Sequence, residues 1–129
     1  MASILYTHHR EEALSAVASG TLKVFAVSDS YTVDAAHTSI NDVAASTRRH
    51  TSVTLGSVTV TGGELDAADL TLTAVTATAC AINAIIVYTE AGSSDSSTLH
   101  VYLEVTPVTP NGGDIILQWA GSSPYIYKL

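Results

Sequence analysis

The sequence predicts a mainly β protein, an antiparallel β-sandwich or barrel-like fold with one short N-terminal helix, formed as a single domain over residues 1–129. Three observations support this prediction. After residue 50, short segments rich in Val, Ile and Thr follow one another, and these residues favour strands. Turn-forming stretches such as EAGSSDSS (90–97) and TPVTPNGG (106–113) separate the segments. Only one stretch, near the N-terminus, has a helical spacing of apolar residues.

The predicted helix covers residues 9–20, HREEALSAVASG. Leu14, Val17 and Ala18 fall on one helical face, and Glu11 and Glu12 lie elsewhere. Acidic residues early in a helix are favoured by the helix dipole, and a glycine such as the last residue of this stretch is common just past the C-terminus. We therefore expect residues 1–20 to form an N-terminal arm followed by a short helix.

A long connection is expected between the first strand and the second half of the chain. In the strand predicted over residues 21–28, apolar side chains occur on both alternating faces, which allows both faces to be covered. Residues 29–51 are instead rich in Ser, Thr, Asp and Asn and show no sustained period of two. A helical turn over 40–45, capped by Ser39 or Thr38, is predicted within this connection. Loops of this length are often functional or held by a partner, so contacts are expected here first.

The remaining strands are predicted from period-two patterns and apolar runs. They lie at residues 52–60, with a slip at Gly56–Ser57, and at 70–78, 81–89, 98–105, 113–120 and 124–129. Residues 64–69 are interpreted as a polar turn. The stretch 69–89 carries no charge after its first residue, but its threonines favour two consecutive strands over a membrane-spanning helix.

Charge and cysteine content narrow the possible partners. The net charge of -7 argues against nucleic acid, whose binding depends on Lys and Arg. The single cysteine allows no intrachain disulfide, and the N-terminus does not resemble a secretory signal. No membrane partner is expected, and the protein is expected to be made in a cytoplasm.

The sequence offers no constellation that predicts catalysis. Of five histidines only His8 and His9 are close together, and adjacent residues point away from each other, so no metal site is predicted. Glu64, Asp66 and Asp69 lack the ordered pattern of a calcium loop. No nucleophile elbow, phosphate-binding glycine loop or Cys/His pair is present. We expect a protein that is not an enzyme and that needs no cofactor.

Aromatic residues gather near the C-terminus, where Trp119, Tyr125 and Tyr127 lie close in sequence. The favoured interpretation is that these rings fill the core and an interface, with phenol groups at the rim. The alternative is a platform on which the three rings stack against a sugar, as in a carbohydrate-binding module of a host-adsorption apparatus.

Several segments resemble, in the same order, those of a set of small virion structural proteins of tailed bacteriophages. Their first common segment is a strand followed by a Tyr-Thr-Pro-Asp-like turn, a His and an Asp-Val pair, and it is similar to TLKVFAVSDSYTVDAAHTSINDVA of this chain. Their later segments are similar to DAADLTLTAVTATACAINAIIVYTEAG and NGGDIILQWAGSSPYIYKL. The resemblance covers residues 22–129. Two departures are Leu72, where a Trp is common, and the basic residues 48–50, where glycines are common.

The resemblance implies a structural role in the virion, as a head decoration (cement) subunit or a neck or tail accessory, and no catalytic residue is carried over from it. We expect contacts with other virion proteins, such as major capsid, neck or tail proteins, and symmetric homo-oligomers. The candidate contact residues are Tyr6, Tyr31, His37, Arg48 and Arg49, with residues 2–6 as an arm along a neighbour.

Overall fold

The computed structural model describes residues 4–62, 64–75, 81–92, 97–117 and 127–128. Over these residues the chain forms antiparallel sheets with one α-helix near the N-terminus, which confirms the predicted mainly β fold. The elements are α1 (Thr7–Ala18), β1 (Leu22–Ser28), the 3-10 turns η1 (Ile40–Asp42) and η2 (Ala45–Thr47), β2 (Arg48–Thr54), β3 (Thr59–Thr61), β4 (Glu64–Asp66), β5 (Leu70–Leu72), β6 (Ile82–Thr89), β7 (Thr98–Val108), β8 (Ile115–Leu117) and β9 (Tyr127–Lys128).

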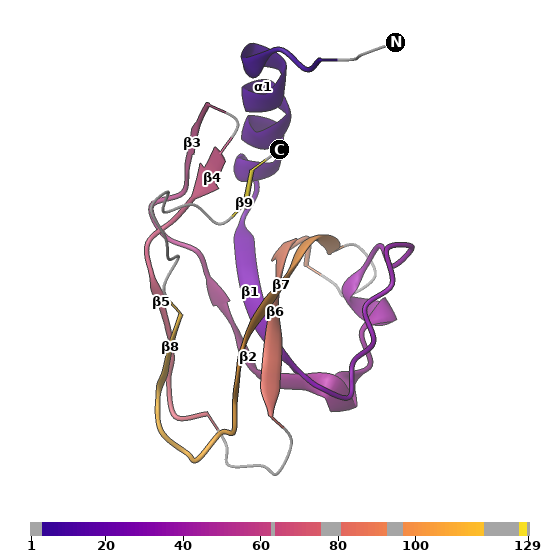
Figure 1. The fold of residues 1–129 in the computed structure, drawn as a ribbon, viewed down its shortest axis with the longest axis vertical. Helices are drawn as coiled ribbons and strands as arrows, with labels where there is room; N and C mark the ends of the chain where they lie inside the picture. Colours follow the sequence, from indigo (N-terminus) through magenta and orange to yellow (C-terminus); the bar gives the residue numbers. More distant parts are fainter. Residues whose placement is uncertain (1–3, 63, 76–80, 93–96, 118–126, 129) are drawn as a thin grey trace.

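The main sheet has four antiparallel strands in the order β2-β1-β6-β7. Its central strands, β1 and β6, have buried residues on both faces, as predicted for residues 81–89. Figure 1 shows the small sheets β3-β4-β9 and β5-β8 on one side of this sheet and the connection that follows β1 on the other. Both faces of the central strands are covered for that reason.

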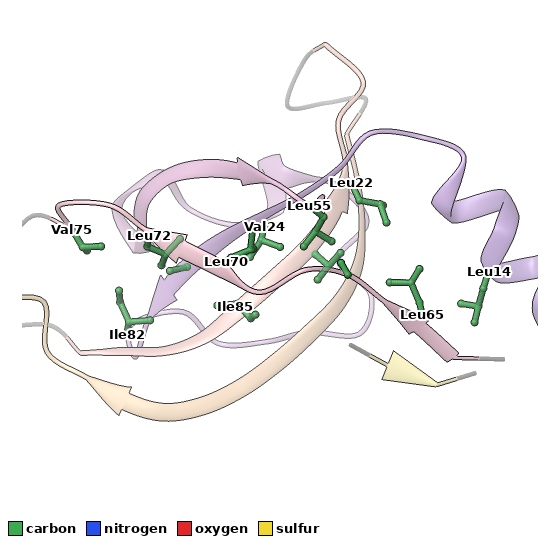
Figure 2. Close-up of a cluster of buried hydrophobic side chains, with 13 residues drawn as sticks. Leu14, Leu22, Val24, Leu55, Leu65, Leu70, Leu72, Val75, Ile82 and Ile85 are labelled. Atoms are coloured by element: carbon green, nitrogen blue, oxygen red, sulfur yellow. The ribbon is translucent and has the colours of Figure 1, made fainter. Parts of the chain in front are cut away.

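The larger core lies between the main sheet and the small sheets. Leu22 and Val24 of β1, Ile85 of β6, Leu65 of β4 and Leu72 of β5 all belong to this core, whose side chains are drawn in Figure 2. Alternate residues of β1 point to this side because side chains of a strand alternate between its two faces. The two fully buried leucines of the small strands therefore attach the small sheets to the main sheet.

A second, smaller core lies on the opposite face. Phe25 of β1 and Tyr88 of β6 meet there edge to face, with ring centroids 5.5 Å apart. Tyr31, Ile40 and Val43 of the connection cover these rings. The connection is thus packed against the sheet by its own apolar side chains.

Helix α1 packs on the β3-β4 hairpin and buries Leu14 in the larger core. The helix begins at Thr7 and not at His9, so Glu11 and Glu12 lie beyond its first turn. The dipole interpretation of these acids is therefore wrong. The Glu11 carboxylate instead accepts a hydrogen bond from the backbone N–H of Gly62, 3.0 Å away, and joins the helix to the hairpin turn.

Several predicted boundaries are corrected. Residues 48–51 belong to β2 and not to the connection, because the backbone of Arg48 and Arg49 pairs with β1. The predicted strand 52–60 is divided between β2 and β3, with a positive φ of 52° at Ser57, near the predicted slip. The predicted turn 64–69 contains β4, and β7 continues to Val108, into the predicted turn 106–113.

Within the described residues, β5 ends at Leu72 and β8 begins at Ile115, so both differ from the predicted strands 70–78 and 113–120. Of the predicted strand 124–129 only Tyr127–Lys128 are described, and they form β9. In the part of the chain that the structure describes, no helix has the length and apolar character to cross a membrane.

Candidate functional site

A hollow of about 220 Å³ opens between the connection and β7. Its lining includes Tyr31, Asp34 and His37 from the connection and His100 and Tyr102 from β7. The Tyr31 hydroxyl lies 2.8 Å from Nδ1 of His37, and the rings of Tyr31 and Tyr102 are 6.1 Å apart between centroids. We call this site the tyrosine hollow.

Burial, followed by the charge interactions with Tyr102, Asp34 and Asp42, raises the pKa of Tyr31 above its ordinary value of 10.0. The phenol therefore keeps its proton at neutral pH and is able to donate it in a hydrogen bond to Nδ1 of His37. This arrangement orients the imidazole without creating a phenolate. Chemically, the tyrosine hollow offers aromatic faces, a fixed imidazole and a carboxylate for hydrogen bonding.

The predicted helical turn of the connection is confirmed as η1, and Ser39 is its N-cap residue, as predicted; Asp42 completes a capping box with it. The Asp42 carboxylate accepts hydrogen bonds from the backbone N–H groups of Thr38, at 2.8 Å, and Ser39, at 3.1 Å. These N–H groups, that of Thr38 most strongly, hold the pKa of Asp42 below its ordinary value of 3.8. This carboxylate therefore fixes the backbone of the two residues that follow His37 and lead into η1.

Arg48 fixes the other end of the same turn. Its guanidinium donates hydrogen bonds to the carbonyl oxygens of Val43, at 2.7 and 3.0 Å, and Ile40, at 2.9 Å. The Val43 carbonyl lies just after η1, and the Ile40 carbonyl also accepts the N–H of Val43 at 2.9 Å. The planar guanidinium can donate to both carbonyls together. Arg48 therefore holds η1 against the start of β2.

A β-bulge places His100 between two hollows. Val87 pairs with Val101 and Tyr88 pairs with Leu99, so His100 is the extra residue on β7. Its Nε2 lies 2.6 Å from Oγ1 of Thr89, and burial lowers its pKa below the ordinary value of 6.5. The imidazole is therefore uncharged at neutral pH.

The second hollow is a groove of about 430 Å³ at the C-terminal end of α1. It is lined by Ala16, Val17, Ser19, Gly20, Thr89, Thr98 and His100. Apart from the imidazole these side chains are small, and none carries a charge at neutral pH. A Cβ on Gly20 would lie 2.9 Å from Cγ2 of Thr89, so glycine allows the helix end to lie this close to β6. We call this site the helix-end groove.

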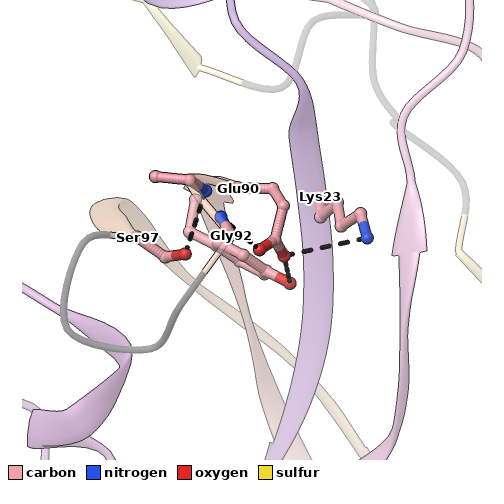
Figure 3. Close-up of polar contacts among 6 residues, drawn as sticks. Lys23, Glu90, Gly92 and Ser97 are labelled. Carbon is pink, nitrogen blue, oxygen red and sulfur yellow. Dashed lines mark hydrogen bonds and ion pairs between the residues drawn. The ribbon is translucent and has the colours of Figure 1, made fainter.

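A polar cluster holds the chain immediately after β6, beside the groove. Figure 3 shows the Glu90 carboxylate between Lys23 and the N–H of Gly92, at 3.7 and 3.0 Å respectively. The hydroxyl of Tyr88 donates to the same carboxylate at 3.4 Å, and Ser97 Oγ accepts the N–H of Ala91 at 3.1 Å. These bonds fix the residues that follow Thr89.

The segment before α1 exposes three consecutive apolar side chains. Ile4, Leu5 and Tyr6 are 80%, 51% and 77% exposed. Figure 1 shows this indigo segment leaving the N-terminal end of α1 and running away from the sheets. Exposed apolar residues that are contiguous mark surfaces for interaction more often than isolated ones do.

The structure brings together only some of the residues predicted for contacts. Tyr31 and His37 meet in the tyrosine hollow, whereas Tyr6 lies at the start of α1. Arg48 binds the carbonyls of η1, and the backbone of Arg49 pairs with that of Ala26.

Little of the sugar-platform alternative falls within the described residues. Trp119 and Tyr125 lie outside the described residues, and of Tyr127 only the backbone is described, paired with Leu65.

Sequence reasoning missed His100 and Tyr102 as site residues. Tyr102 follows the alternating pattern of β7, and its position beside Tyr31 depends on how the connection folds over the sheet. His100 is placed by the bulge, and TLHVYLEV shows no break in its pattern that would have located it.

Among the described residues, no three His, Cys, Asp or Glu side chains come together as a group that could hold a metal ion. A scan against protein-family models and a search of curated proteins returned no match to this chain.

Proposed function

We propose that this chain is a non-enzymatic structural protein of a tailed-phage virion, either a capsid decoration (cement) subunit or a neck or tail accessory protein. It acts by contact with neighbouring subunits, including other virion proteins and further copies of itself. The ordered resemblance of residues 22–129 to small phage structural proteins supports the choice of a virion.

The observation that carries the contact role is the exposed apolar segment Ile4–Tyr6. Placing three large apolar side chains in water forgoes the free energy of burying them, which is about 1.5–3 kcal/mol for each large aliphatic side chain. A neighbouring subunit that covers the segment recovers part of that free energy. The strand edges of the main sheet offer backbone groups for further contacts.

The role in the virion is tested by mass spectrometry of purified particles of the phage that encodes the chain, after heads and tails are separated. We expect its peptides in one fraction, in a fixed ratio to a major structural protein of that fraction. Enrichment with heads identifies a decoration subunit, and enrichment with tails or necks identifies an accessory protein. Absence from mature particles contradicts the proposal.

A further inference from the structure

We propose that the segment Ile4–Tyr6 of one copy of this chain occupies the helix-end groove of a second copy. The inference rests on the proposed role in subunit contact and identifies both surfaces of one such contact. The occupant is the exposed apolar segment, and the receiving surface is the groove between the end of α1 and the start of β7.

The first argument is that a chain cannot fill its own groove with this segment. The segment and the groove lie at opposite ends of α1, as Figure 1 shows for the two helix ends. From Thr7 to Ala16 the helix advances about 14 Å, at 1.5 Å per residue. Ile4 reaches back at most about 10 Å from Thr7, and Leu5 and Tyr6 reach less. A second copy is therefore required.

The second argument is that the two surfaces match in chemistry. Ile4, Leu5 and Tyr6 carry no charge, and Ala16, Val17 and Gly20 give the groove small, apolar walls. An apolar occupant buries its surface there without stripping water from a charged group.

His100 completes the uncharged lining of the groove. Burial lowers the pKa of this ring below 6.5, and its Nε2 is engaged by Thr89. Because the imidazole is neutral at neutral pH, an apolar side chain can approach it without desolvating a cation.

The third argument is size. The groove holds about 430 Å³, within the range of about 300–1,000 Å³ in which pockets accommodate compact ligands. The segment already has an extended backbone at Tyr6, with φ -64° and ψ 145°, directly before the rigid helix. Little backbone ordering next to the helix is therefore needed for insertion.

The test uses complementary variants of the purified full-length protein. Leu5→Asp damages the segment and leaves the groove intact; Ala16→Glu places a charge in the groove and leaves the segment intact. Each variant alone should associate at least about tenfold more weakly than the unmodified chain, because each contact then buries a charge against apolar surface. Sedimentation velocity measures the association, and circular dichroism checks that both variants fold.

Mixing the two variants separates this contact from other modes of association. One intact segment and one intact groove remain in the mixture, so a mixed dimer should form more readily than a dimer of either variant alone. Ile116→Asp is the matched control, because Ile116 is also apolar and 65% exposed but lies on β8. This control should associate like the unmodified chain. Failure of the mixture to form dimers, or equal weakening by Ile116→Asp, overturns the inference.

A cross-linking measurement keeps the test decisive even if the charged variants unfold. In a background with Cys80→Ala, a Leu5→Cys chain is mixed with an Ala16→Cys chain and oxidised. We expect a disulfide between the two chains in clear excess over a mixture of Leu5→Cys with Ile116→Cys. Equal cross-linking in both mixtures contradicts the inference.

The outcomes also distinguish this inference from the proposed function. If the chain is found in virions but the segment does not bind the groove, only the inference fails. If the segment binds the groove but mature particles lack the chain, the assignment to a virion fails and the contact stands.

Discussion

Thr89 Oγ1 lies 2.6 Å from Nε2 of His100, beside the helix-end groove, and burial lowers the pKa of this histidine below its ordinary value of 6.5. The unfolded chain therefore binds a proton at this residue at a higher pH than the folded chain does. Folding stability should fall as the pH drops below about 6.5, and this loss should be complete below the folded-state pKa. The folded protein is therefore expected to be more stable at neutral pH than at mildly acidic pH.

We expect His100→Gln to reduce the acid-side fall in stability, because the glutamine side chain does not titrate. Urea denaturation at several pH values between neutral and mildly acidic measures this effect. His9→Gln is the matched control, because it makes the same substitution at an exposed histidine on α1. An unchanged slope in His100→Gln would show that His100 does not cause the pH dependence.

Gly20→Ala should destabilise the protein by about 1–3 kcal/mol, the usual cost of overpacking. The added Cβ would lie 2.9 Å from Cγ2 of Thr89, whose hydroxyl is held by His100. Thr89→Ser removes that methyl group, so the double variant should recover much of the loss in a double-mutant cycle of unfolding free energies. Gly56→Ala is the control, because no atom lies within 4 Å of its Cβ position.

Arg48→Lys should loosen the connection and lower the free energy of unfolding by about 1–3 kcal/mol. This is the usual cost of leaving a buried hydrogen-bonding group without its partner. A single ammonium does not reproduce the bonds of the planar guanidinium to Val43 and Ile40. Hydrogen exchange should accelerate at the amide of Val43, which bonds to the carbonyl of Ile40. Equal exchange rates in the two proteins would contradict this role of Arg48.

Asp42 provides an acid-range prediction. Its folded-state pKa lies below 3.8 because it accepts the N–H groups of Thr38 and Ser39. Its contribution to stability is present above about 3.8 and is lost as the pH falls through the folded-state pKa. NMR titration should show the Thr38 and Ser39 amide signals moving together below pH 3.8. Asp42→Asn should abolish this movement.

The carbohydrate alternative predicts saturable binding on a glycan array that Trp119→Ala, Tyr125→Ala or Tyr127→Ala abolishes. The proposed structural role predicts no saturable glycan binding by the purified protein. Binding that depends on these three rings would contradict the proposed role and establish the sugar platform. Binding that survives all three substitutions would exclude these rings as the platform.

The parts of the fold that the sequence predicted well are those where burial follows a local pattern. The apolar run that forms β6 needs cover on both faces, and its surroundings in the structure provide it. The turn η1 was predicted because residues able to cap it stand directly before an apolar residue, Ile40. In both cases neighbouring residues in the chain contain the information.

The parts that sequence reasoning missed depend on distant pairing. The polar residues 48–52 give no strand pattern, and they form β2 because β1 offers them a backbone edge. Leu65 stands between acidic residues but is fully buried, because the hairpin sheet packs on the main sheet. The bulge at His100 arises from the register between β6 and β7, which no short segment specifies.

The pairing of β1 with β6 also has a consequence for synthesis. Leu22 pairs with Thr89 and Ser28 with Ile82, so β1 emerges from the ribosome long before its central partner exists. Contacts between residues far apart in sequence slow folding, because a long loop must close before they form. A nascent chain that ends before β6 therefore lacks Thr89, Thr98 and His100 of the helix-end groove. The proposed contact with a neighbour can form only after β7 has been translated.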